Sequence, residues 1–136
     1  MSQPDFKARV ILEATVSPSE DSAKVVKAIQ NIIGETSGSV SVGPLSARLV
    51  SEDPRALVRV RDQLRDRHVR AVARKQLLFK KVGHATSMML NRQAAAAGVV
   101  AICGSPEESP LGPIYITIAS DRIDAVIDWL TAHPEG

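Results

Sequence analysis

The sequence is poor in the residue types on which several common kinds of site depend. Only four of its 136 residues are aromatic, which weighs against RNA-binding modules that stack unpaired bases on rings set in a sheet. The single cysteine, Cys103, stands in an apolar run, where a buried and inert thiol is expected rather than a nucleophile or a metal ligand. We therefore expect a cytoplasmic protein that folds without disulfides.

Recognisable sets of reactive groups are also missing. The sequence contains no phosphate-binding glycine loop, nucleophile elbow or catalytic triad order. His68, His84 and His133 are far apart, and none has a cysteine or histidine neighbour at metal-ligand spacing. The longest uncharged apolar run, around residues 94–103, is too short to cross a bilayer of about 30 Å. We predict a non-enzymatic protein with no cofactor, no metal and no membrane contact.

What the sequence does contain is a strong segregation of charge. Eleven of its seventeen basic residues lie between residues 55 and 92, where Asp62 and Asp66 are the only acids, so this segment carries a net charge of about +9. The remainder carries about −7, and the total of +2 hides the polarity. Such segregation concerns where a polyanion can dock more than how a chain folds.

The hydrophobic pattern predicts a mixture of strands and helices. Alternation over residues 6–16 indicates a strand, and Ser17-Pro18-Ser19-Glu20 reads as a capping box that opens a helix ended by Gly34. Further strands are expected at residues 40–42, 47–51, 86–90, 99–103 and 114–118, and further helices after Asp53-Pro54, at residues 91–97 and after Asp121. The elements do not alternate strictly and no linker interrupts them. We predict a single domain over residues 1–136, an α+β sandwich with a mostly antiparallel sheet and helices packed on one side.

The longest helical segment should be broken. Its first part has one apolar stripe and its second part another, rotated by roughly 130° at about 100° per residue, so one straight helix cannot bury both. The two sets are Leu57, Val60 and Leu64, and then Val69, Val72, Ala73 and Gln76. We therefore expect a break near residues 66–68.

Opposite the second apolar set, basic residues share one stripe. Arg67, Arg70, Arg74 and Lys81 follow helical spacings, and Lys75 and Lys80 lie nearby. We call the first four the basic ridge. Few acids stand at helical spacing to neutralise them, although an ordinary solvated helix face is the alternative. Asp124 and Asp128 form a carboxylate pair that we place on the solvated outer face of the last helix.

Two stretches are more specific than the rest of the chain. In Leu90-Asn91-Arg92-Gln93-Ala94-Ala95, the polar groups of Asn91, Arg92 and Gln93 stand at a strand-to-helix junction, where they could grip a phosphate or ribose. The alternative is that Asn91 caps the helical turn. The second stretch, Glu108-Ser109-Pro110-Leu111-Gly112-Pro113-Ile114, could be a recognition loop or a rigid turn between strands.

With the capping box and the closing Ile127-Asp128-Trp129-Leu130, these stretches resemble the archaeal uncharacterised protein family 0201, whose domain is often labelled RNA-binding or exosome-associated. The resemblance spans nearly the whole chain. It implies a fold like that of ribosomal large-subunit protein five and a homodimer, with RNA recognition proposed and no established activity. The chain departs from the family in having Arg92 where lysine is usual, and in its small residues at 96–100.

Three functional interpretations follow. The leading one is a protein that binds structured RNA through shape and phosphate contacts, because guanidinium groups bind phosphate in a bidentate fork. The RNA-binding residues would be Arg67, Arg70, Arg74, Lys75, Lys80, Lys81, Asn91, Arg92 and Gln93. The alternative is an obligate homodimeric scaffold, or a subunit of a larger complex, with no nucleic-acid role. In it the basic helix meets an acidic protein surface, and the small apolar residues 94–100 suit close subunit contact. The third is an enzyme with a pocket assembled by the fold from His84, Asn91 and Glu108.

Overall fold

The fold is built on one five-stranded sheet, seen in a computed structural model that describes residues 4–34, 36 and 38–132. The strand order is β2-β3-β1-β5-β4, and every neighbouring pair is antiparallel. The strands are β1 (Arg9–Thr15), β2 (Ser39–Val42), β3 (Ser46–Ser51), β4 (Ala85–Leu90) and β5 (Ile114–Ala119). The α-helices are α1 (Ser22–Ile33), α2 (Val58–Asp66), α3 (Arg70–Lys80), α4 (Arg92–Ala96) and α5 (Ile123–Leu130), and short 3₁₀ helices span Pro54–Leu57 and Pro106–Glu108.

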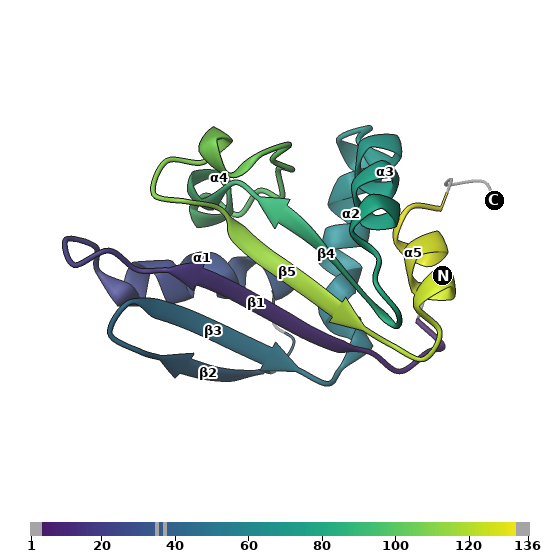
Figure 1. Cartoon of the computed structure of the whole chain (residues 1–136), viewed down its shortest axis with the longest axis horizontal. Helices are drawn as coiled ribbons and strands as arrows, with labels where there is room; N and C mark the ends of the chain where they lie inside the picture. Colours follow the sequence, from purple (N-terminus) through teal and green to yellow (C-terminus); the bar gives the residue numbers. More distant parts are fainter. Residues whose placement is uncertain (1–3, 35, 37, 133–136) are drawn as a thin grey trace.

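The sheet has one covered face and one open face. Figure 1 shows the helices gathered behind the sheet and beyond its β4 side, while the near face of β3, β1 and β5 carries no helix. Along β1, Leu12 is fully buried on the helix side, whereas Arg9 and Glu13 face the open side and pair with Glu52 and Arg48. The predicted α+β sandwich, with a mostly antiparallel sheet and helices on one side, is confirmed.

The predicted break in the long helical segment is also confirmed. Helix α2 ends at Asp66 and α3 begins at Arg70, and His68 between them adopts the left-handed region with φ 59°. The backbone N–H of Val69 bonds to the carbonyl of Leu64 at 3.0 Å, which closes the corner. The break turns α3 so that one of its sides lies against α5, and this sets the surroundings of the basic ridge.

The buried side of α3 differs in part from the prediction. Ala73 and Leu77 are fully buried, Val69 packs partly against the core, and Gln76 is half-buried. Val72, which we placed in the buried set, is 56% exposed. The predicted stripe was wrong at this position because the helix begins only at Arg70 and turns its Val72 side away from the sheet.

Three local predictions were wrong. The Ser17 N–H does bond to Glu20 at 2.8 Å, but α1 begins later, with Asp21 as its N-cap. Residues 99–103 form no strand, since Ile102 makes only an isolated bridge to Leu90. The N-cap of α5 is residue 122, without a side-chain cap, and not Asp121. Two of these errors concern only the residue at which a helix begins, whereas in the third a single bridge takes the place of the predicted strand.

Candidate functional site

Three of the four cations of the basic ridge bind groups on α5 or just beyond its end. Arg74 Nη1 lies 2.8 Å from Asp128 Oδ1, and Lys81 Nζ lies 2.6 Å from Asp124 Oδ1. Arg70 Nη1 donates a hydrogen bond to the backbone carbonyl of residue 132 at 3.0 Å. Both acids belong to α5, which runs beside α3. The predicted open ridge was therefore wrong, because three of its four residues hold α3 to α5.

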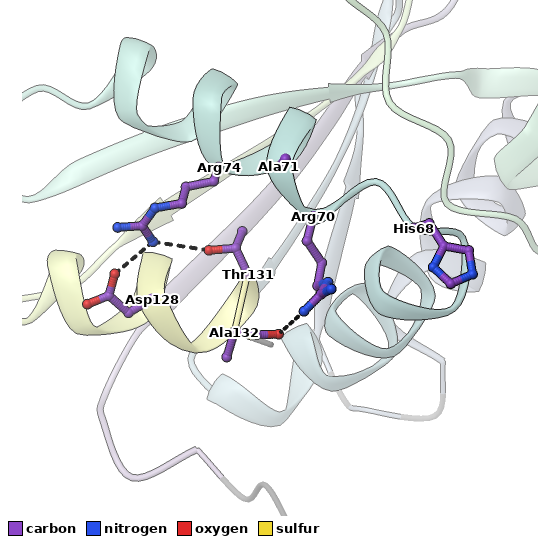
Figure 2. Close-up of a pocket in the computed structure, with 7 residues that line it drawn as sticks. All are labelled: His68, Arg70, Ala71, Arg74, Asp128, Thr131 and Ala132. Carbon is purple, nitrogen blue, oxygen red and sulfur yellow. Dashed lines mark hydrogen bonds and ion pairs between the residues drawn. The ribbon is translucent and has the colours of Figure 1, made fainter. Parts of the chain in front are cut away.

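A hollow of about 470 Å³ lies at this joint, and Figure 2 shows the residues that line it. It is lined by His68, Arg70, Ala71, Arg74, Asp128, Thr131 and Ala132. Arg74 also donates to Thr131 Oγ1 at 3.2 Å, so its guanidinium bridges two side chains of the α5 end. The cationic groups in the hollow already donate to α5, and a carboxylate faces them. The Asp128 carboxylate opposes the binding of a phosphate in this hollow, while Arg70 Nε is buried there without a hydrogen-bond partner among the described residues.

The sequence carried a signal for these contacts that our interpretation missed. Asp124 and Asp128 are four residues apart and so share one face of α5. We assigned that face to solvent because α5 is the last helix. Arg74 and Lys81, seven residues apart on the other helix, match that spacing, so complementary charge periodicity could have predicted the pairing.

Three cations of this segment form no ion pair with a described residue. Arg67, Lys75 and Lys80 are exposed and form no ion pair with any residue that the structure describes. Arg67 lies in the corner between α2 and α3, Lys75 in the middle of α3, and Lys80 at its end. They form a scattered positive surface, not a continuous ridge.

The outer face of α3 is apolar to a degree that the sequence analysis did not anticipate. Phe79 is 84% exposed, Val82 just beyond the helix is 79% exposed, and Leu78 is 46% exposed. Val72, one heptad before Phe79, lies on the same side of the helix. Lys75 stands between them. We call Val72, Lys75, Leu78, Phe79 and Val82 the α3 outer face.

Arg92 is buried and bound to a carboxylate, so the structure contradicts its predicted role as an RNA contact. Its Nη1 lies 2.9 and 2.8 Å from the two carboxylate oxygens of Glu20, and its Nη2 lies 3.4 Å from Thr15 Oγ1. The side chains of Arg92 and Glu20 are only 6% and 13% exposed. A guanidinium in this position cannot reach a phosphate in solvent.

The rest of the motif around Arg92 has a structural role. Asn91 caps α4 by accepting the backbone N–H of Ala94 at 2.8 Å, as the alternative interpretation held. Ser109 Oγ accepts the backbone N–H of Arg92 at 3.0 Å and donates to the carbonyl of Gly112. The two specific stretches of the sequence thus meet and brace each other. Among the predicted residues of this motif, Gln93 alone is exposed.

The small residues of 94–100 also serve the fold. Asn31 on α1 donates from Nδ2 to the carbonyls of Ala95 and Ala96 at 3.0 and 3.4 Å, and Ala95 is buried. Gln63 Nε2 donates to the carbonyl of Gly98 at 3.0 Å. Carbonyl groups of this segment therefore bind α1 and α2 of the same chain, while the Ala96 and Ala97 side chains remain exposed.

Glu20 is the titratable group most closely tied to this joint. The Ser17 backbone N–H, followed by the Arg92 guanidinium, holds the pKa of the Glu20 carboxyl below its ordinary value of 4.5, against the opposing effect of burial. The bound form is therefore the carboxylate. This partner of Arg92 was in the predicted capping box, but its contact over 72 residues of sequence could not be read from local spacing.

The Cys103 thiol and the possible metal ligands form no reactive site among the described residues. Burial, with a smaller effect of the Glu108 carboxylate, raises the pKa of the Cys103 thiol, which favours the unreactive protonated form. No three His, Cys, Asp or Glu side chains come together as a metal site in the described part of the chain. His133 lies outside the described residues. No described helix is long and apolar enough to cross a membrane.

Removing Arg92 should strongly destabilise the fold. Arg92→Ala leaves the Glu20 carboxylate in a largely buried place without its cation, and breaking such pairs costs about 3–5 kcal/mol. The matched control is Arg9→Ala, which removes a guanidinium from the exposed pair with Glu52 and should cost under about 1 kcal/mol. Urea unfolding of both variants at neutral pH measures the difference. Equal small losses would show that the Arg92–Glu20 pair does not brace the fold.

The same pair predicts a pH dependence. Because the folded-state pKa of Glu20 is lowered, its carboxylate contributes stability that is present above the ordinary pKa of 4.5 and lost as pH falls through the folded-state pKa. The free energy of unfolding of the wild type should exceed that of Glu20→Gln most near neutral pH, and the gap should shrink in acid. Urea titrations over a pH series test this. A gap that stays constant into strong acid would contradict it.

Comparison with known proteins places the chain among archaeal relatives. It is 37% identical over 125 residues to a UPF0201 protein of Sulfurisphaera tokodaii, which covers 90% of this chain and 86% of the relative. It is 38% identical over 125 residues to a UPF0201 protein of Sulfolobus acidocaldarius, with the same coverage. No family model matches the sequence.

Solved structures agree. A UPF0201 protein from Methanococcus jannaschii superposes with a TM-score of 0.76 at 26% identity, covering 94% of this chain and 96% of that one. A DUF54 protein from Methanothermobacter thermautotrophicus, at 17% identity, shows the same fold with a TM-score of 0.62 and covers 93% of this chain and 94% of that one. Sequence identity and coverage of this extent show that the chain belongs to the archaeal UPF0201 family.

Proposed function

We propose that this chain is a non-enzymatic subunit of a protein complex and that it docks an acidic partner protein on the α3 outer face. The observation that carries the proposal is the exposure of Phe79 and Val82, at 84% and 79%. Val72 and Phe79 share one side of α3, Val82 follows the helix, and a large exposed apolar patch typically marks a surface that another molecule covers.

The charges around this face indicate what kind of partner fits. Lys75 lies within the apolar face, Lys80 follows Phe79, and Arg67 precedes the helix. None of the three is neutralised by a described residue. Desolvating these cations against a neutral surface would be costly, whereas carboxylates at the rim of a partner would compensate them. The partner should therefore combine an apolar centre with an acidic rim.

The same face weakens the case for a duplex RNA ligand. The affinity for a phosphate backbone grows with the number of free cations that contact it. Arg74 and Lys81 are paired with acids of α5 and so contribute less to that number. A sugar-phosphate backbone offers little apolar surface against which Val72, Leu78 and Val82 could be buried. Protein–protein interfaces, by contrast, are enriched in aromatic side chains at their centres.

RNA binding remains a second candidate, supported by one specific observation. Phe79 is highly exposed and stands between Lys75 and Lys80, an arrangement that can stack a base and hold the flanking phosphates. Under this candidate the family's RNA-binding label and its expected likeness to ribosomal large-subunit protein five would apply to this chain. It favours unpaired nucleotides at α3 over the folded RNA that the sequence analysis expected.

Co-purification from the native host separates the two candidates. Tagged wild type is compared with Phe79→Ser/Val82→Ser and with Leu111→Ser/Tyr115→Ser, a control that removes two exposed apolar side chains elsewhere. We expect a protein that survives nuclease treatment, that is retained by the control and that is lost from the α3 variant. Charge reversal at Lys75 and Lys80 should also weaken its retention, because the partner's rim is acidic.

The outcomes that contradict the docking proposal are equally specific. Retention of the same proteins by the Phe79→Ser/Val82→Ser variant would exclude the α3 outer face. Recovery of nucleic acid alone would favour RNA, and binding to a single-stranded oligonucleotide should then weaken with salt, with a slope that falls on replacing Arg67, Lys75 and Lys80 by alanine. Replacing the exposed Lys7, Lys24 and Lys27 by alanine is the matched control for that slope.

A further inference from the structure

Another hollow lies beside the joint of Arg92 and Glu20. It measures about 400 Å³ and is bounded by the start of α1, by α4 and by the loop before β5. Its apolar part includes Val25 and Ala28, which are buried residues of α1, and Leu111 of the loop. Small-molecule sites commonly have this size and combine an apolar lining with a few polar groups.

The hollow contains one charge of each sign that has no ionic partner. Asp21 and Lys24 both line it, and both are exposed. One oxygen of Asp21 accepts the Ala23 backbone N–H at 3.0 Å, but neither Asp21 nor Lys24 forms an ion pair with a residue that the structure describes. The other charged residues of the lining, Glu20 and Arg92, bind each other. The lining is therefore neutral, with an available carboxylate and an available ammonium group one helical turn apart.

Arg92 adds an unsatisfied donor to this lining. Its Nη1 and Nη2 atoms bond to Glu20 and Thr15, but its Nε is buried and has no hydrogen-bond partner among the described residues. A buried donor without an acceptor is unfavourable, because it has lost its bond to water without a replacement. A ligand carboxylate on the Arg92 side of the hollow would supply an acceptor to the guanidinium.

Leu111 lines the hollow in a strained conformation. The Gly112 N–H donates to the Ser109 carbonyl at 2.9 Å, which closes a turn with Pro110 and Leu111 at its centre. Leu111 has φ 67°, and positive φ at this position of a turn normally requires glycine or asparagine. Its side chain is 58% exposed, so burial within the described chain does little to offset the strain. Strained residues cluster at ligand-binding segments, and an apolar ligand group in the hollow would cover this leucine.

We propose that this hollow binds a free amino acid with an apolar side chain. A zwitterion complements a neutral lining with separate charges, whereas a simple anion would meet the Asp21 carboxylate and a simple cation the Lys24 ammonium group. The ligand carboxylate lies toward Lys24 and Arg92, its ammonium group toward Asp21, and its side chain against Val25 and Leu111. The inference does not rest on what α3 binds, because the residues that line the hollow belong to other elements.

Isothermal titration calorimetry with L-leucine as the probe tests the ligand class. We expect the wild type to bind L-leucine. Two analogues should each bind about tenfold more weakly, because each lacks one charge-assisted hydrogen bond. They are 4-methylpentanoate, which is leucine without its ammonium group, and leucinamide, in which the carboxylate is replaced by a neutral amide.

Two substitutions locate the charged contacts. Asp21→Asn keeps an oxygen that caps α1 but removes the charge, so it should weaken leucine binding about tenfold without weakening that of 4-methylpentanoate. Lys24→Met should weaken leucine binding without weakening that of leucinamide. Lys7→Met is the matched control, since it removes an exposed lysine outside the hollow and should bind leucine as the wild type does.

Leu111→Gly distinguishes a ligand contact from a purely structural turn. Glycine adopts positive φ without strain, which offsets its greater conformational freedom in the unfolded chain. We therefore expect the midpoint of urea unfolding to stay unchanged or to rise, while the affinity for leucine falls several-fold. A leucine with only a structural role would leave that affinity unchanged.

Three results would overturn the proposal. The first is no detectable binding of L-leucine at millimolar concentration. The second is equal affinity for leucine, 4-methylpentanoate and leucinamide, which would exclude recognition of a zwitterion. The third is an affinity for leucine that Asp21→Asn, Lys24→Met and Leu111→Gly all leave unchanged, which would place its site elsewhere. None of these results bears on the partner of the α3 outer face, so the two proposals fail separately.

Discussion

The ion pairs between α3 and α5 determine what this protein can present to a partner. Asp128 binds Arg74 and Asp124 binds Lys81, while Arg70 bonds to the backbone at the end of α5. These contacts use up the cations that would otherwise form a phosphate-binding ridge. The burial of Ala73 and Leu77 in the core sets the rotation of α3, which leaves its apolar side toward solvent. These ion pairs therefore neutralise two cations of the basic ridge, while the apolar side of α3 stays exposed.

A second buried contact explains why the most distinctive stretches of the sequence are there. Arg92 and Glu20 join α4 to the segment before α1, and Ser109 ties the proline-rich loop to the same point. The polar groups of these stretches satisfy one another and the backbone. Their chemistry is that of a joint between distant parts of the chain.

Local patterns predicted the architecture well. Alternation identified the strand around Leu12, and the mismatch of two apolar stripes located the break at His68. Features set by distant residues were missed. The partner of Arg74 lies 54 residues away on α5, and the partner of Arg92 lies 72 residues away. Charge counts along a segment cannot show such neutralisation, because it depends on how the helices pack.

The same limit explains the apolar α3 face. The predicted buried stripe was correct for Ala73 and, in part, for Val69, but wrong for Val72, which the structure exposes. Sequence reasoning could therefore place α3 and most of its buried side, but not the boundary between that side and the exposed apolar one.

Competitive labelling of lysine amines tests the central claim, the neutralisation of α3 by α5, most directly. Lys75 and Lys80 should react fast because they are exposed and unpaired in the described structure, and Lys81 should react slowly because Asp124 holds its ammonium group. In Asp124→Ala, the rate of Lys81 should rise towards theirs. Equal fast labelling of all three lysines in the wild type, unchanged in the variant, would contradict the account.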